Sequence, residues 1–127
     1  MGKHESLWYG TEKIDSFDRL KKDIKTDVLI IGGGLCGLLT AYSLKEKGVN
    51  CVLVEKDRVM NGVSGNTTAK ITAQHGLIYH KLLKSMGEEK AKLYLKINLE
   101  AIGRFEELSE KYSCDFQKKD NFVYSTE

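Results

Sequence analysis

A glycine-rich turn between an apolar run and a helical pattern constrains the fold of this chain more than any other feature. Gly32, Gly34 and Gly37 form the pattern G-x-G-x-x-G directly after the apolar residues 28–31. An unbroken apolar run that ends in glycines is typical of a parallel strand covered on both faces. Residues 35–47 then follow a helical pattern, and Gly48 stands where helices often end in a left-handed conformation.

The next segment predicts the partner of that strand. Residues 49–54 read VNCVLV, so that strand, helix and strand follow one another between residues 26 and 55. This order is a β-α-β crossover, which pairs two parallel strands through a right-handed connection. The fold class predicted is therefore α/β, with a Rossmann-like dinucleotide-binding unit.

Each glycine of the turn has a physical task in such a unit. Gly32 permits the tight turn out of the strand, Gly34 lets the backbone approach a pyrophosphate, and Gly37 lets the helix pack close to the strand. The free N–H groups and the positive dipole end of the helix then face the phosphates. The alternative is a glycine-rich turn with no ligand.

Glu55 ends the second strand, at the separation from the glycines where dinucleotide-binding proteins carry a ribose-binding acid. Its carboxylate can accept hydrogen bonds from both ribose hydroxyls of the adenosine half. A carboxylate there would repel a 2′-phosphate, so NADP is disfavoured, while FAD and NAD both remain open. The alternative for Glu55 alone is a solvated acid at the end of a strand.

The rest of the chain divides into an N-terminal arm, 1–25, with short helical pieces, and a domain, 26–127. Apolar residues of the arm, Leu7, Trp8 and Tyr9 among them, could anchor it against a larger body. Residues 57–75 predict a long loop with one short helical turn, and 76–112 predict helix interrupted near Gly87. Segments 114–116 and 122–124 predict the start of a β-hairpin. Eight residues form a helical stripe expected to be chiefly core: Ala91, Tyr94, Leu95, Asn98, Ile102, Phe105, Leu108 and Tyr112.

Composition excludes several classes of protein. A net charge of +2, spread along 127 residues, gives no concentrated field for nucleic acid or a membrane surface, and no apolar run approaches the roughly 20 residues of a membrane span. We therefore expect one cytoplasmic protein without a nucleic-acid or membrane partner. Cys36, Cys51 and Cys114 are predicted to be reduced core cysteines, and no ligand spacing indicates a metal site.

The chain also resembles a known family. The stretch TDVLIIGGGLCGLLTAYSLKEKGVNCVLVEKDRVMNGVSGNTTAK looks like the N-terminal signature of the D-amino-acid oxidase and glycine oxidase superfamily of FAD-dependent oxidoreductases. The segments GVSGNTTAKITAQHGLIYHKL and AKLYLKINLEAI most resemble a bacterial subgroup in which a C-terminal Rieske iron–sulfur domain follows in longer chains. A plain NAD-dependent dehydrogenase would lack the segment 64–75.

The resemblance implies FAD as cofactor and assigns site residues. Around the pyrophosphate it places Gly32, Gly34, Leu35, Cys36 and Gly37, and at the adenosine ribose Glu55 and Lys56. Along the pyrophosphate, ribityl chain and flavin ring it places Ser64, Gly65, Asn66, Thr67, Thr68, Ala69 and Lys70. Asn66 stands where some members carry a flavin-linking histidine, so a covalent flavin is not expected.

The function implied is oxidation of a small amine or amino acid by hydride transfer to flavin. The chain matches the N-terminal part of such proteins, so we expect it by itself to show no turnover and to self-associate, and a Rieske [2Fe–2S] cluster is expected only in a longer parent chain. Catalytic residues are not identified. Two alternatives remain: an NAD-binding dehydrogenase domain, and a non-catalytic piece of the fold without cofactor.

Overall fold

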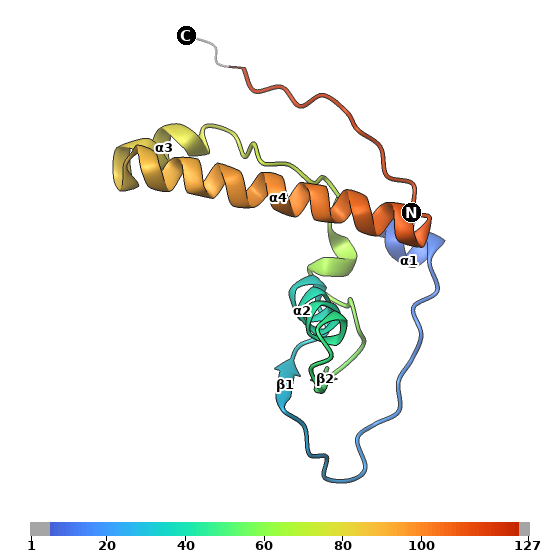
Figure 1. Cartoon of the computed structure of the whole chain (residues 1–127). Helices are drawn as coiled ribbons and strands as arrows, with labels where there is room; N and C mark the ends of the chain where they lie inside the picture. The colour runs from blue at the N-terminus through green and yellow to red at the C-terminus, as the bar shows by residue number, and fades with distance from the viewer. Residues whose placement is uncertain (1–5, 125–127) are drawn as a thin grey trace. The chain divides into compact units, whose positions relative to one another are not determined.

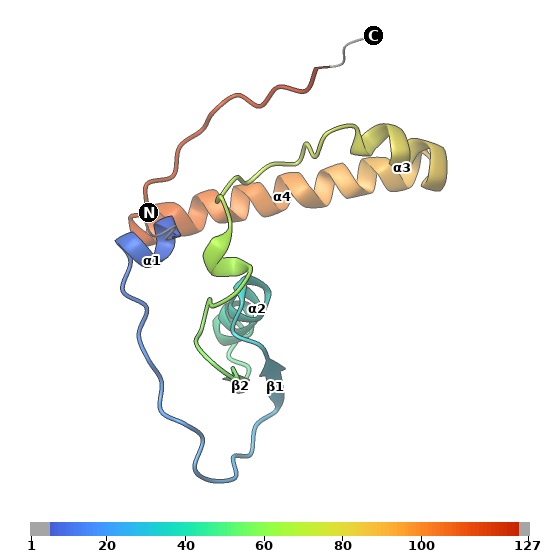
Figure 2. The same ribbon diagram turned by 180° about the vertical axis from the view of Figure 1, so that it is seen from behind.

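A computed structural model describes residues 6–124 of the chain. It contains two compact units, one up to Thr68 and one from Ala69 onward. Figures 1 and 2 show the helices and strands of both units from opposite sides. Each unit is described by itself below. The predicted boundary between an arm and a domain at residue 25 stays a prediction.

The first unit contains the predicted β-α-β crossover. Strand β1 (Val28–Ile31) leads into helix α2 (Leu35–Glu46), which returns the chain to strand β2 (Cys51–Val54). The strands are parallel, with Val28 opposite Cys51 and Ile31 opposite Val54. Gly48, with φ +71°, follows the end of α2, as the sequence predicts. The α/β fold class and the parallel pair are confirmed.

The two-stranded sheet is covered on one face. Helix α2 packs on both strands, whereas Leu29 and Ile31 of β1 are exposed, Ile31 at 81%. The expectation that β1 is covered on both faces is therefore wrong for the described residues, because a single crossover helix lies on only one side of a sheet. The exposed side chains alternate with half-buried ones along β1, which follows the two-residue period of a strand.

Two short helices complete the first unit. Helix α1 (Leu7–Thr11) begins at Ser6, whose side chain accepts a hydrogen bond from the Trp8 N–H. The loop after β2 carries the single helical turn that the sequence predicts, the 3₁₀-helix η1 (Ser64–Asn66). Helix α1 packs against η1, so the N-terminal segment lies beside a loop more than 50 residues further along the chain.

The second unit is a pair of helices. Helix α3 (Ile78–Met86) and helix α4 (Glu88–Tyr112) pack on each other and are separated by Gly87, with φ +82°. The rings of Tyr79 and Tyr94 meet edge to face, with 6.1 Å between their centroids. The predicted helical region and its interruption near Gly87 are confirmed.

The stripe on α4 is only partly a core. Ala91 is buried and most of the other stripe residues are half-buried, but Leu95 and Tyr112 are exposed. The prediction is wrong for those two, because α3 has nine residues and α4 has 25, so that α3 covers one side and part of the length of its neighbour. Helix α4 ends at Ser113 in the left-handed conformation.

The predicted β-hairpin is absent. Residues 114–124 contain no strand, and Phe122 and Tyr124 are 81% and 87% exposed. A lone two-stranded hairpin is marginal in water, and the described part of the second unit offers no sheet for it to join. Side chains hold the segment instead: Lys118 pairs with Glu106 at 2.6 Å, and the Asn121 amide donates to Thr72 Oγ1 at 3.2 Å.

The three cysteines are free, as predicted, but only Cys51 is partly buried. Cys36 and Cys114 are exposed, so their assignment to the core is wrong. Cys36 lies in the first turn of α2, and Cys114 follows the end of α4, where less of the chain covers a side chain. Among the helices that the structure describes, none has the length and apolarity to cross a membrane.

Candidate functional site

The glycine turn joins the ends of the two strands. Gly32 has φ +107°, a conformation that side chains disfavour, and its N–H donates to the Val54 carbonyl at 2.8 Å. At Gly37 a Cβ atom would lie closer to the Gly32 carbonyl oxygen than real Cβ atoms ever approach. The tight turn at Gly32 and the close packing at Gly37 are therefore both present as predicted.

The N-terminus of α2 opens at this turn. Gly34 is the N-cap and has no side chain to bond the first N–H groups of the helix. The Leu35 N–H donates to Ser64 Oγ at 2.9 Å, whereas the N–H groups of Cys36 and Gly37 have no acceptor within residues 6–124. Unpaired N–H groups at the positive end of a helix favour an anion.

Glu55 is fixed beside the turn. Its Oε2 accepts a hydrogen bond from the Gly33 N–H at 2.7 Å, and its Oε1 accepts one from the Asp57 N–H at 3.1 Å. The Gly33 hydrogen bond, followed by that of Asp57, lowers the pKa of Glu55 below its ordinary value of 4.5. The side chain is therefore a carboxylate at neutral pH, and each oxygen retains lone pairs for a further donor.

The loop after β2 lies against the same turn. The Met60 N–H donates to the Gly33 carbonyl at 2.7 Å, and Ser64 Oγ reaches the Leu35 N–H. A Cβ on Gly34 would stand 3.1 Å from Ser64 Oγ. The structure thus brings together three predicted parts of the site: the glycine turn, Glu55 and the Ser64 end of the small-residue loop.

Some of the other residues predicted for the site bond to groups outside the glycine turn. Within the loop, the Asn66 side chain donates to the Gly62 carbonyl at 2.6 Å rather than to the turn. Ala69 and Lys70 fall in the second unit, where Lys70 Nζ donates to Asn121 Oδ1 at 2.7 Å. The place of Thr67, Thr68, Ala69 and Lys70 along the flavin stays a prediction. The place of Lys56 at the ribose stays a prediction as well.

The sequence predicts that apolar residues of the arm, Leu7, Trp8 and Tyr9 among them, could anchor it against a larger body, but it does not predict which groups they contact. Ser6 Oγ donates to the Gly65 carbonyl, the Trp8 indole N–H donates to the Thr67 carbonyl at 2.8 Å, and the Tyr9 hydroxyl lies 3.2 Å from the Met60 carbonyl. The apolar and aromatic character of residues 7–9 was the only available signal. Most of these bonds end on backbone carbonyls, which a sequence pattern does not reveal.

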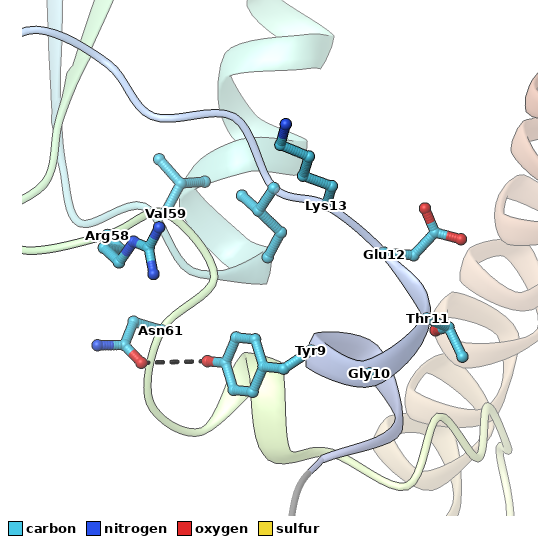
Figure 3. Close-up of a pocket in the computed structure, with 9 residues that line it drawn as sticks. Tyr9, Gly10, Thr11, Glu12, Lys13, Arg58, Val59 and Asn61 are labelled. Atoms are coloured by element: carbon cyan, nitrogen blue, oxygen red, sulfur yellow. Dashed lines mark hydrogen bonds between the residues drawn. The ribbon is translucent and has the colours of Figure 1, made fainter.

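An open pocket of about 700 Å³ has two walls. One wall is residues 9–14, which include the end of α1, and the other is residues 58, 59 and 61. Figure 3 shows the Tyr9 ring reaching from α1 to Asn61, where its hydroxyl lies 3.1 Å from Oδ1. Lys13 and Arg58 add two cationic side chains to the walls. None of the predicted cofactor residues lines this pocket.

The geometry of the turn fits the ADP half of a dinucleotide. The absence of a side chain at Gly34 and the N–H groups at the start of α2 suit a pyrophosphate, and the ionised Glu55 suits a ribose diol. The flavin half would have to be met by other residues. Nothing in this arrangement by itself distinguishes FAD from NAD.

Comparisons with known proteins make that distinction. A family model described as FAD dependent oxidoreductase matches residues 27–127. A Bacillus subtilis protein whose name describes it as a Rieske 2Fe-2S iron-sulfur protein, YhfW, is 37% identical over 123 residues, which are 95% of this chain and 24% of that protein.

Two further relatives are named as oxidoreductases. The gamma-glutamylputrescine oxidoreductase of Escherichia coli is 29% identical over 97% of this chain and 30% of its own length. The oxidoreductase OrdL of Haemophilus influenzae is 36% identical over 72% of this chain and 22% of its own. The chain thus spans less than a third of the length of these relatives, and no solved structure matches it.

Proposed function

The chain belongs to the FAD-dependent oxidoreductase family, whose cofactor is FAD, and we propose that its first unit binds the ADP half of FAD at the glycine turn. The pyrophosphate would lie at the N-terminus of α2 and the adenosine ribose at Glu55. The observation that carries this proposal is the bond from the Gly33 N–H to Glu55 Oε2, 2.7 Å long. It fixes a carboxylate beside the N–H groups of a helix N-terminus, which is the pairing that a dinucleotide requires.

We assign each contact of the cofactor to residues of this chain. The pyrophosphate would be held by Gly32, Gly34, Leu35, Cys36 and Gly37, with Lys56 joining Glu55 at the ribose. The loop from Ser64 through Asn66, Thr67, Thr68 and Ala69 to Lys70 would pass along the pyrophosphate, the ribityl chain and the ring. Ser64 supports this assignment, because its hydroxyl already lies at the first N–H of α2.

The reaction proposed is oxidation of an amine or amino acid. FAD, when bound, supplies a hydride acceptor for a C–H bond next to nitrogen. The residues of this chain bind and orient the cofactor: the helix N-terminus offsets phosphate charge, and Lys70 would offset negative charge near the ring. Support for an amine comes from a relative named for gamma-glutamylputrescine. The amine, a cytoplasmic location and, in a longer chain only, a Rieske cluster stay predictions.

Isothermal titration of the 127-residue chain with FAD, NAD and NADP tests cofactor binding. We expect saturable binding of FAD and none of NADP, because Glu55 is ionised and would repel a 2′-phosphate. Glu55→Ala should weaken FAD binding roughly 10- to 100-fold, as expected for loss of a hydrogen bond to a charged group. Equal affinity for FAD in that variant would remove Glu55 from the site.

The substrate class needs a separate experiment. Because the 127-residue chain by itself is expected to show no turnover, a longer chain that carries this unit is loaded with FAD and mixed without oxygen with a panel of primary amines, amino acids, 2-hydroxy acids and polyols, and the flavin absorbance is followed. Loss of the oxidised flavin spectrum with amines or amino acids supports the assignment. Reduction by 2-hydroxy acids or polyols, and by no amine, would contradict it.

A further inference from the structure

Helix α1 and its N-cap Ser6 are bonded to both ends of a loop, residues 60–67, that includes the first residues assigned to the cofactor. Near the start of the loop, the Tyr9 hydroxyl lies at hydrogen-bonding distance from the Met60 carbonyl and from Asn61 Oδ1. Near its end, Ser6 Oγ bonds the Gly65 carbonyl and the Trp8 indole bonds the Thr67 carbonyl. Two side chains of the five-residue helix α1 and that of its N-cap Ser6 therefore hold residues 60–67.

The opposite side of the same loop is bonded to the glycine turn. The Met60 N–H donates to the Gly33 carbonyl at 2.7 Å, and Ser64 Oγ accepts from the Leu35 N–H at 2.9 Å. The loop is therefore fixed between α1 on one side and the start of α2 on the other. Figure 3 shows the Tyr9 end of this arrangement.

The packing leaves little freedom between α1 and the loop. Gly65 is buried, and a Cβ atom there would overlap both the Tyr9 hydroxyl and the Met60 carbonyl. Close packing of this kind transmits a displacement rather than absorbing it. A shift of α1 would therefore move Gly65, and with it Ser64 at the N-terminus of α2.

We propose that Ser6, Trp8 and Tyr9 are positioning residues for FAD, which hold residues 60–67 in the conformation that the cofactor meets. They do not touch the cofactor in this proposal. They remove the conformational freedom of the loop before binding, so that less order has to be gained when FAD arrives. The inference rests on the proposed FAD site and adds to it a segment outside the residues assigned to the cofactor.

The first experiment measures the loop without cofactor. Hydrogen exchange followed by mass spectrometry on the full 127-residue chain compares wild type with Ser6→Ala and Tyr9→Phe, each of which removes one hydroxyl. We expect faster exchange across residues 58–70 and unchanged exchange in α3 and α4. Leu7→Ala is the matched control, because Leu7 lies in the same helix and is 67% exposed. Unchanged loop exchange in both hydroxyl variants would overturn the proposal.

The second experiment measures FAD affinity by isothermal titration. Ser6→Ala and Trp8→Phe should each weaken FAD binding by about threefold to tenfold, the range expected for one net hydrogen bond. Ser6→Thr, which keeps a hydroxyl, should restore the wild-type affinity, and Leu7→Ala should not change it. A loosened loop with wild-type FAD affinity would overturn the positioning role.

A spectroscopic signature separates positioning from general stability. Trp8 is the single tryptophan of the chain, so its fluorescence reports on this contact alone. We expect bound FAD to quench it in the wild type and in Ser6→Thr, and to quench it less at saturation in Ser6→Ala, where the indole is less fixed. Equal quenching in both serine variants at saturating FAD would contradict the proposal. A wild-type chain that binds no FAD would instead overturn the proposed cofactor site, and the positioning role with it.

Discussion

Gly37→Ala tests the close packing of the turn most severely. The added methyl group would enter the space occupied by the Gly32 carbonyl, a backbone atom that cannot rotate away. Overpacking of this kind costs about 3 kcal/mol at the upper end of its range, and the helical preference for alanine over glycine offsets about 1 kcal/mol. We therefore expect a net loss of about 2 kcal/mol in the free energy of unfolding of the first unit.

Urea unfolding followed by Trp8 fluorescence measures this loss, because Trp8 lies in the first unit. Gly103→Ala is the matched control. Gly103 lies within α4, and a Cβ atom there would meet no atom within 4 Å. We expect that control to stabilise the chain, measured by circular dichroism, by about 0.5 to 1 kcal/mol.

The same substitution, glycine to alanine, is thus expected to change the free energy of unfolding in opposite directions at Gly37 and at Gly103. The difference arises only from what the methyl group meets, since both glycines lie in helices. If Gly37→Ala stabilised the first unit as Gly103→Ala stabilises the second, the packing of α2 against the turn would not be as close as described. The account of the turn would then be refuted.

Three further predictions concern the charge, the ligand and the exposed strand. Glu55 has a lowered pKa, so its ionised side chain stabilises the folded state above pH 4.5, its ordinary pKa, and this stabilisation is lost as the pH falls through the lowered pKa. Unfolding midpoints measured against pH should show this dependence in wild type and not in Glu55→Gln. Gly34→Val should abolish FAD binding in a titration while circular dichroism keeps its helical signal, because the side chain would occupy the phosphate approach and meet Ser64. Light scattering should show self-association, because Leu29 and Ile31 expose one face of the sheet; Ile31→Lys should reduce it, and a monodisperse wild-type monomer would contradict the prediction.

The local pattern of the sequence predicts the β-α-β unit closely. Each step depends on neighbours along the chain: an apolar run, glycines at fixed spacing, a helical period and a second apolar run. The structure places β1, α2 and β2 within two residues of the predicted ranges. The position of Glu55 follows from the same order, because the end of β2 is paired with the end of β1.

The errors occur where the outcome depends on what covers a segment. Leu29 and Ile31, Cys36, and Leu95 with Tyr112 have apolar or small side chains that the sequence assigns to a core, yet they are exposed. Periodicity indicates which face of an element is apolar, but it does not show whether another element packs there. The hairpin at 114–124 fails for a related reason, because strands need a partner sheet.

The bonding partners of α1 could not be predicted from any pattern in the sequence. Ser6, Trp8 and Tyr9 bond mainly to carbonyl groups some 50 residues or more away. Backbone carbonyls have the same chemistry at every residue, so no residue type marks them as partners. Only the fold brings the two segments together, and the role of α1 could therefore be inferred only from the structure.

The central claim is that FAD binds at the N-terminus of α2 beside Glu55, and amide chemical shifts test it most directly. The measurement is a ¹H–¹⁵N NMR titration of the labelled 127-residue chain with FAD. We predict that the largest shifts fall on the amides of Gly33 to Gly37 and on those of Glu55 and Ser64, with little change in α3. Shifts centred on other residues, or no shifts at saturating FAD, would contradict the claim.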